Sequence, residues 1–161
     1  MTNTEYNSSV DSYADAVYRF ILKNIKDEDK AKDIVQDTFE KLWIKAETVT
    51  FSKVKSYIFT SAYHTMIDYI RKDKKQSLMD DISEMKHSHS KHYSDIDDIL
   101  QEAVDLLPAI QKSVVLLRDY EGYSYKEIAN TTKLNESQVK VYIFRARKFL
   151  KSYIGSIETV I

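Results

Sequence analysis

The sequence predicts an all-α protein: two small helical domains joined by a polar linker, with a helix-turn-helix in the second domain. Only two Gly and one Pro occur among 161 residues, so tight hairpins are disfavoured and helices are favoured. Apolar residues recur at three- and four-residue steps on both sides of a polar, mainly acidic stretch. We therefore expect domains over residues 1–75 and 96–161, with the linker over residues 76–95.

Composition narrows the classes of function. The chain has no Cys, which excludes a disulfide framework and cysteine-ligated zinc, and this fits a cytoplasmic protein. No apolar run reaches the roughly 18 residues of a membrane span, and the start lacks a signal-peptide layout. The net charge of −1 combines basic patches with acidic stretches, which indicates a protein partner besides nucleic acid.

Three amphipathic helices are predicted before the linker. They span about Asp11 to Ile25, Asp29 to Ala46 and Ser52 to Lys72. Because the connections are short, we expect a compact bundle. The outer face of the second helix carries acidic and amide side chains, which chemistry alone would explain as a solvated surface: Asp33, Gln36, Asp37 and Glu40.

The third of these helices mixes aromatic and basic side chains, a combination that suits the bases and phosphates of unpaired nucleic acid. Three of its aromatic residues are expected in the core: Tyr57, Phe59 and Tyr69. Tyr63 and His64 lie off the main apolar stripe and are better candidates for stacking on bases. Arg71 and Lys72 follow with positive charge.

After the linker, a fourth helix is predicted from about Ile96 to Pro108 and a fifth from Ala109 to Tyr120. The stretch from Tyr125 to Phe149 then has the pattern of a helix, a tight turn and a basic helix. Ser124 and Asn135 are predicted N-caps, and the residues three positions later are able to complete a capping box.

The second helix of this motif is predicted to lie in the major groove of DNA. Its inner face is apolar: Val139, Ile143, Ala146, Leu150 and Tyr153. On its outer face we expect Gln138, Val141 and Arg145 to read bases, and the lysines at 140, 148 and 151 to hold phosphates. Lys133 stands where such turns often place Gly, so a positive φ there costs on the order of 1 kcal/mol.

Two other functions remain as alternatives. His87, His89 and His92, with Asp80, Asp81 and Asp95, have the chemistry of a metal site. They fall in the polar linker, where solvated side chains are the preferred interpretation. A stand-alone helix-turn-helix regulator with a helical sensing domain is the second alternative. An enzyme is not expected, because the sequence has no HExxH motif, glycine-rich phosphate loop or nucleophile–base set.

Four stretches together resemble the extracytoplasmic-function (ECF) sigma factors of bacteria. Residues 33–43, DIVQDTFEKLW, and 54–72, VKSYIFTSAYHTMIDYIRK, are similar to region two of that family. Residues 106–129, LLPAIQKSVVLLRDYEGYSYKEIA, and 139–150, VKVYIFRARKFL, are similar to region four. The resemblance covers nearly the whole chain in the family's order.

The resemblance implies a cofactor-free transcription factor whose partners are core RNA polymerase, promoter DNA and an anti-sigma factor. Polymerase contacts are implied for the second helix: Asp33, Gln36, Asp37, Thr38, Phe39 and Glu40. Contacts with the −10 element are implied for Tyr63, His64, Arg71 and Lys72. Contacts with the −35 element are implied for Ser124, Lys126, Ser137, Gln138, Lys140, Val141, Phe144, Arg145 and Lys148. Tyr63, His64 and Gln138 depart from residues frequent in the family, so the resemblance does not fix the promoter sequence.

Overall fold

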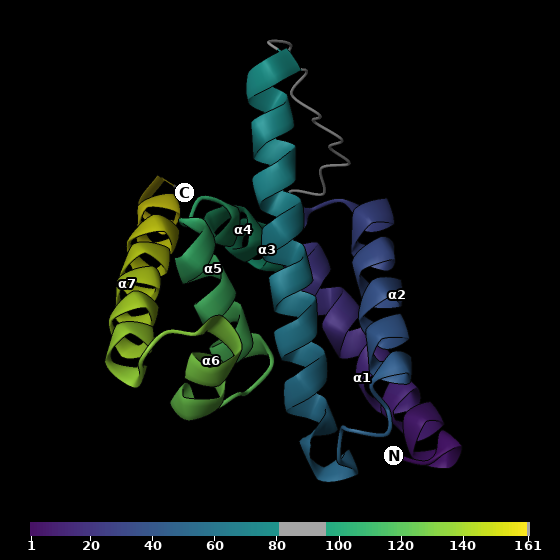
Figure 1. Ribbon diagram of the computed structural model, residues 1–161. Helices are drawn as coiled ribbons and strands as arrows, with labels where there is room; N and C mark the ends of the chain where they lie inside the picture. The colour runs from purple at the N-terminus through teal and green to yellow at the C-terminus, as the bar shows by residue number, and fades with distance from the viewer. Residues whose placement is uncertain (81–95, 161) are drawn as a thin grey trace.

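The computed structural model describes residues 1–80 and 96–160, and the regular structure within these ranges is helical throughout. Helices α1–α3 form an N-terminal unit and helices α4–α7 form a C-terminal unit, with α3 lying between α2 and the C-terminal unit (Figure 1). The prediction of an all-α protein with a helix-turn-helix near its C-terminus is confirmed. Most of the predicted linker, including the histidines of the metal-site alternative, lies outside the described residues.

The N-terminal unit consists of α1 (Asn3–Ile25), α2 (Glu28–Ile44) and α3 (Val54–Asp80). Its core contains fully buried side chains from all three helices, such as Phe20, Leu42 and Ile58. Burying each such side chain contributes about 1.5–3 kcal/mol relative to its exposure to water. All three residues fall within the helical segments that apolar periodicity predicted.

Two helix ends in the N-terminal unit differ from the prediction. Helix α1 begins at Asn3 instead of near Asp11, because the Thr2 hydroxyl accepts from the Glu5 amide and the Glu5 carboxylate accepts from the Thr2 amide. Helix α3 continues to Asp80 instead of ending near Lys72. No Gly or Pro lies between Lys72 and Asp80, so no helix-breaking residue ends the helix near Lys72.

The C-terminal unit consists of α4 (Ile96–Asp105), α5 (Ala109–Val115), α6 (Tyr125–Thr132) and α7 (Glu136–Val160). The predicted fifth helix is α-helical only as far as Val115, and it ends in a π-helical turn over Leu116–Tyr120. Helices α6 and α7 form the predicted helix-turn-helix, with α7 packed on both α5 and α6.

The predicted caps of the helix-turn-helix are present. The Ser124 hydroxyl accepts from the Glu127 amide at 3.1 Å, and the Glu127 carboxylate accepts from the Ser124 amide at 3.1 Å. Asn135 and Gln138 make the same reciprocal pair at 2.8 and 3.0 Å. Lys133 has a φ of 60°, the left-handed conformation that Gly adopts without strain in such turns.

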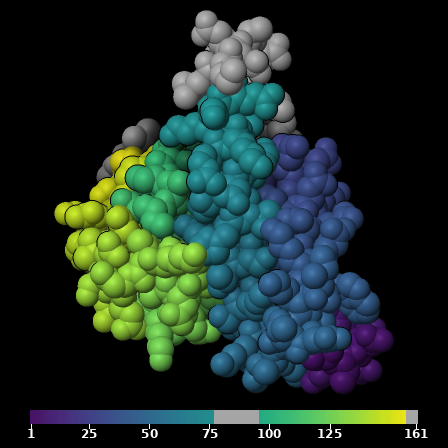
Figure 2. Space-filling model, viewed as in Figure 1, coloured from purple at the N-terminus to yellow at the C-terminus, as the bar shows by residue number. Residues whose placement is uncertain are grey.

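The two units pack directly against each other, and Figure 2 shows the surface of the C-terminal unit abutting α3. The ring of Phe59 on α3 meets the ring of Tyr123 edge-on, with centroids 4.9 Å apart. The Arg19 guanidinium donates two hydrogen bonds to the Glu121 carboxylate, at 2.8 and 3.1 Å. Lys26 pairs with Asp105 at 3.3 Å across the same junction. The two units therefore share an interface, and the predicted boundary at residue 75 falls within α3.

Candidate nucleic-acid and protein interfaces

The acidic face of α2 consists of Asp33, Gln36, Asp37 and Glu40, all of which lie at least partly in solvent. Asp37 pairs with Lys41 one turn later at 3.0 Å, and Gln36 donates to Glu40 at 3.3 Å. The neighbouring Thr38 and Phe39, which were also predicted to contact a partner, are buried. The Thr38 hydroxyl donates to the Ile34 carbonyl at 2.7 Å. In this structure the predicted contact surface on α2 therefore reduces to the four residues of the acidic face.

Tyr63, predicted to stack on unpaired bases, is only 5% exposed, so the expectation that it lies off the packed surface was wrong. It follows Phe59 by one helical turn and therefore lies on the side of α3 that faces the C-terminal unit. Its ring meets the ring of His64 edge-on at 5.4 Å. Burial raises the pKa of the Tyr63 phenol, which stays neutral.

His64 is half-buried beside the turn of the helix-turn-helix. Its Nε2 atom is buried and has no hydrogen-bond partner among the described residues. Burial lowers the pKa of its imidazole, the charge of Lys133 lowers it further, and Asp68 opposes both effects. In contrast, Arg71 and Lys72 are exposed on α3, and Arg71 pairs with Asp68. The four candidate −10 residues are therefore divided between a covered surface and an open one.

In contrast, all nine residues predicted to contact the −35 element are exposed; two lie at the start of α6, and seven lie on α7. Its inner face is closed by Val139, Ile143 and Ala146, which are at most 2% exposed. Two of the nine candidates also have structural roles: Ser124 caps α6, and the Gln138 side-chain oxygen accepts from the Asn135 amide. The Gln138 side-chain amide group remains free of this cap to donate elsewhere.

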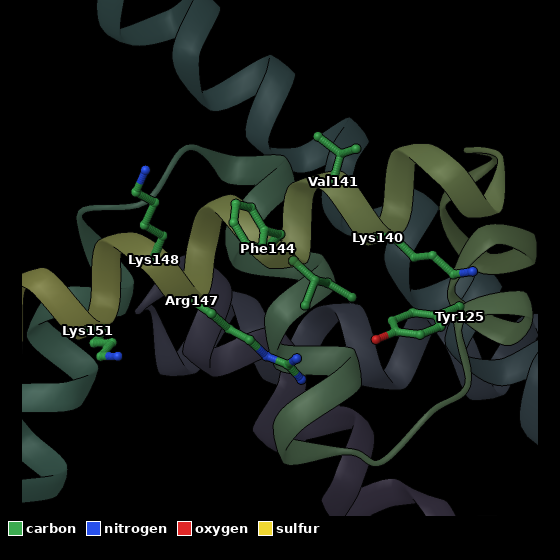
Figure 3. Close-up of a pocket in the computed structure, with 8 residues that line it drawn as sticks. Tyr125, Lys140, Val141, Phe144, Arg147, Lys148 and Lys151 are labelled. Atoms are coloured by element: carbon green, nitrogen blue, oxygen red, sulfur yellow. The ribbon is translucent and has the colours of Figure 1, made fainter.

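An open groove runs between the start of α6 and the outer flank of α7 (Figure 3). Its lining combines apolar and basic side chains: Tyr125, Lys140, Val141, Ile143, Phe144, Arg147, Lys148 and Lys151. Arg147 is held in place by two hydrogen bonds to the Asp119 carboxylate. The Arg118 guanidinium lies 4.5 Å from the centre of the Tyr125 ring.

Sequence reasoning missed two contributors to this groove. Tyr125 is not among the residues predicted to contact DNA, but it is partly exposed and lines the groove. Arg147 is likewise absent from the residues predicted to contact DNA, although it lines the groove. Its partner Asp119 lies 28 residues earlier in the sequence, and no local pattern indicates that pairing.

Within the described residues we also searched for a metal site and for a membrane-spanning helix. There, no group of three His, Asp or Glu side chains is arranged to hold a metal ion. Among the described helices, none combines the length and the apolar character needed to cross a membrane.

Comparison with known proteins gives consistent matches. Residues 10–76 match the family model for sigma-70 region 2, and residues 97–150 match that for sigma-70, region 4. RNA polymerase sigma factor SigV of Bacillus subtilis (strain 168) is 36% identical over 137 residues, which cover 83% of this chain and 81% of SigV. ECF RNA polymerase sigma factor SigM of the same organism is 32% identical over 145 residues, covering 87% and 89% respectively. Among solved structures, the sigma factor RpoE of Bartonella quintana, in complex with the anti-sigma factor NepR, superimposes with a TM-score of 0.80. It has 25% sequence identity, and the match covers 93% of this chain and 96% of that chain.

Proposed function

The chain belongs to the ECF sigma factors, and we infer from this membership that it binds core RNA polymerase and directs promoter recognition and opening. A subunit of this kind has no catalytic activity of its own and acts in the cytoplasm with the polymerase. The observation that carries the proposal is the match to both sigma regions, in order, together with relatives aligned over most of their length.

Recognition of duplex DNA is assigned to α7. Its first turns, at Gln138 and Val141, face base edges, while Lys140 and Lys148 flank them and reach phosphates. The exposure of all nine predicted residues supports this docking, because no other element of the described structure has to move aside. The capping box of α6 supports it further by fixing the helix that crosses the DNA backbone.

Binding to core polymerase is assigned to the acidic face of α2. Its four side chains are exposed or partly exposed, so they are available to a complementary basic surface. Thr38 and Phe39 support this surface from inside the N-terminal unit.

Capture of the melted −10 strand is assigned to α3, and it requires a change of conformation. Tyr63 and His64 face the C-terminal unit, so we propose that α3 and α6 separate when the promoter is opened. Arg71 and Lys72 are available for phosphate contacts before that separation.

Regulation by an anti-sigma factor is the last part of the proposal. It rests on family membership and on the solved complex of the Bartonella sigma factor with NepR. The interface between the two units is one surface that such a partner could stabilise or replace.

Transcription from a library of promoter sequences, with core polymerase and with or without this protein, tests the proposal. We expect the protein to enrich templates that share two short elements, and to do so only with polymerase present. Tight, sequence-specific binding to duplex DNA without polymerase, and no effect on initiation, would instead indicate a stand-alone regulator.

A further inference from the structure

The outer face of α7 exposes two apolar side chains that the protein core does not need. Val141 is 45% exposed and Phe144 is 68% exposed, while the core contacts of this helix come from Val139, Ile143 and Ala146. Val141 and Phe144 are three positions apart, so they lie on neighbouring parts of one helix surface. Single exposed apolar residues are ordinary, but two neighbouring ones among basic side chains mark a candidate contact surface. Phe149, a further exposed apolar residue of α7, stacks on Tyr153 instead.

The surroundings of these two residues identify the chemistry of that occupant. Exposed Lys140, Arg145 and Lys148 flank them, and no acidic residue occurs on α7 between Glu136 and Glu158. Both residues also line the groove beside Tyr125 (Figure 3). The ligand therefore carries negative charge at its edges and an apolar feature between them. Duplex DNA entered from the major groove has this arrangement, with phosphates on either side of the base edges.

We propose that Val141 and Phe144 read the methyl groups of thymine in the −35 element. The thymine C5-methyl is the apolar group that the bases of unmodified DNA present in the major groove, and apolar side chains contact it in specific complexes. This inference rests on the proposed function, because it assumes that α7 docks at a promoter.

The helix geometry limits where these thymines lie. Residues three apart on a helix are separated by about 4.5 Å along its axis, and stacked base pairs by about 3.4 Å. Because a base pair contains at most one thymine, the two methyl groups are expected at adjacent base pairs, on the same strand or on opposite strands. Arg145, which follows Phe144, has the donor geometry for a guanine near the same position.

The test replaces thymine by deoxyuridine, which removes the methyl group and leaves base pairing intact. The probe is a promoter selected from the library by the wild-type holoenzyme, with each −35 thymine of both strands replaced in turn. For wild-type holoenzyme we expect affinity to fall about three- to tenfold at each of two adjacent positions, as expected for one buried methyl group at each.

Three variants make the assignment specific. Val141→Ala and Phe144→Ala are each expected to lose sensitivity to deoxyuridine at one position and to retain it at the other. Phe149→Ala is the matched control, because Phe149 is also an exposed aromatic residue of α7 but stacks on Tyr153 farther along the helix. It is expected to keep the wild-type pattern. Unchanged circular dichroism establishes that each variant folds.

The outcomes separate this inference from the proposed function. A holoenzyme that requires the −35 element but tolerates every deoxyuridine overturns the inference and leaves the function intact. If Val141→Ala and Phe144→Ala keep the wild-type deoxyuridine pattern but lose binding to an anti-sigma protein, the two residues form a protein-binding surface and the inference is wrong. A protein that selects no promoter with core polymerase contradicts the proposed function itself.

Discussion

The two surfaces assigned to DNA differ in what covers them. On α7, the residues assigned to the −35 element are all exposed, and the core beneath them is closed by separate apolar residues. On α3, Tyr63 is buried and His64 is half-buried against the C-terminal unit. The surface proposed for the −35 element is therefore accessible in this conformation, whereas the surface proposed for the −10 element is also part of an interface within the protein.

That interface has the physical character of a reversible contact. Its ion pairs involve half-exposed partners such as Arg19 and Lys26, and such pairs contribute about 0.2–1 kcal/mol each. Two buried polar atoms near it, the Tyr123 hydroxyl and His64 Nε2, have no hydrogen-bond partner among the described residues. Each such atom costs about 1–3 kcal/mol. The apolar contact between Phe59 and Tyr123 offsets part of that cost.

The largest expected effect concerns the acidic face of α2, which is exposed on the N-terminal unit. Asp37→Arg reverses the charge on the acidic face and removes the pair with Lys41. We expect the affinity for core polymerase to fall by about 2–5 kcal/mol, the range for lost interfacial charge pairs. A pull-down titration measures this. Glu102→Arg, the same charge reversal at an exposed site of α4, is the control and should leave the affinity unchanged.

The second prediction breaks the contact between the two units. The Glu121 carboxylate is only 4% exposed and accepts both hydrogen bonds from Arg19, so Glu121→Arg places two like charges together. The closed arrangement is the one in this structure, in which α3 packs against the C-terminal unit. We expect it to be destabilised by about 1–3 kcal/mol, less than for a fully buried pair because Arg19 is half in solvent.

The absence of Cys from the chain makes this second prediction easy to measure. Spin labels on cysteines introduced at the exposed Lys32 and Lys126 report the distance between α2 and α6. Glu121→Arg is expected to lengthen and broaden that distance, and the exchanged pair Arg19→Glu with Glu121→Arg should restore it. An unchanged distance in Glu121→Arg would show that other contacts hold the units together.

A smaller effect is expected at the turn of the helix-turn-helix. Lys133 has a φ of 60°, and Lys133→Gly removes a strain of about 1 kcal/mol, so the thermal midpoint should rise. Lys26→Gly is the matched variant, because Lys26 has the same φ but pairs with Asp105. The rise in thermal midpoint should be smaller for Lys26→Gly, because this substitution also removes the pair with Asp105. A lower midpoint for Lys133→Gly would indicate that the lysine makes a stabilising contact of its own.

The smallest effect is a pH dependence of the closed arrangement. The pKa of His64 is lowered in this structure, chiefly by burial, so a conformation that exposes His64 binds its proton more readily. The closed arrangement is therefore fully stabilised above the ordinary histidine pKa of about 6.5 and loses stability as the pH falls through that value. The spin-label distance should lengthen between about pH 7.5 and 6, and His64→Gln should reduce this change. Equal pH responses of the two proteins would exclude His64 as the cause.

Much of the C-terminal unit was predictable because its determinants are local. Ser124 with Glu127, and Asn135 with Gln138, form caps between residues three positions apart, so the sequence alone locates the starts of α6 and α7. The early start of α1 has the same kind of signal in Thr2 and Glu5, which the periodicity of the following residues had obscured. The exposed face of α7 was also predictable from local sequence, because the apolar residues that recur every three to four positions mark the opposite, buried face.

The sequence by itself therefore determined the helical class, the helix-turn-helix and the residues that α7 presents to a partner. Only the tertiary structure decided that Tyr63 is buried, that Glu121 is paired with Arg19, and that Arg147 is fixed by Asp119. The reason is physical: helical periodicity records how a segment faces its own bundle, whereas these contacts join residues 28 to 102 positions apart. Such pairings depend on how whole helices pack, and no short stretch of sequence encodes that packing.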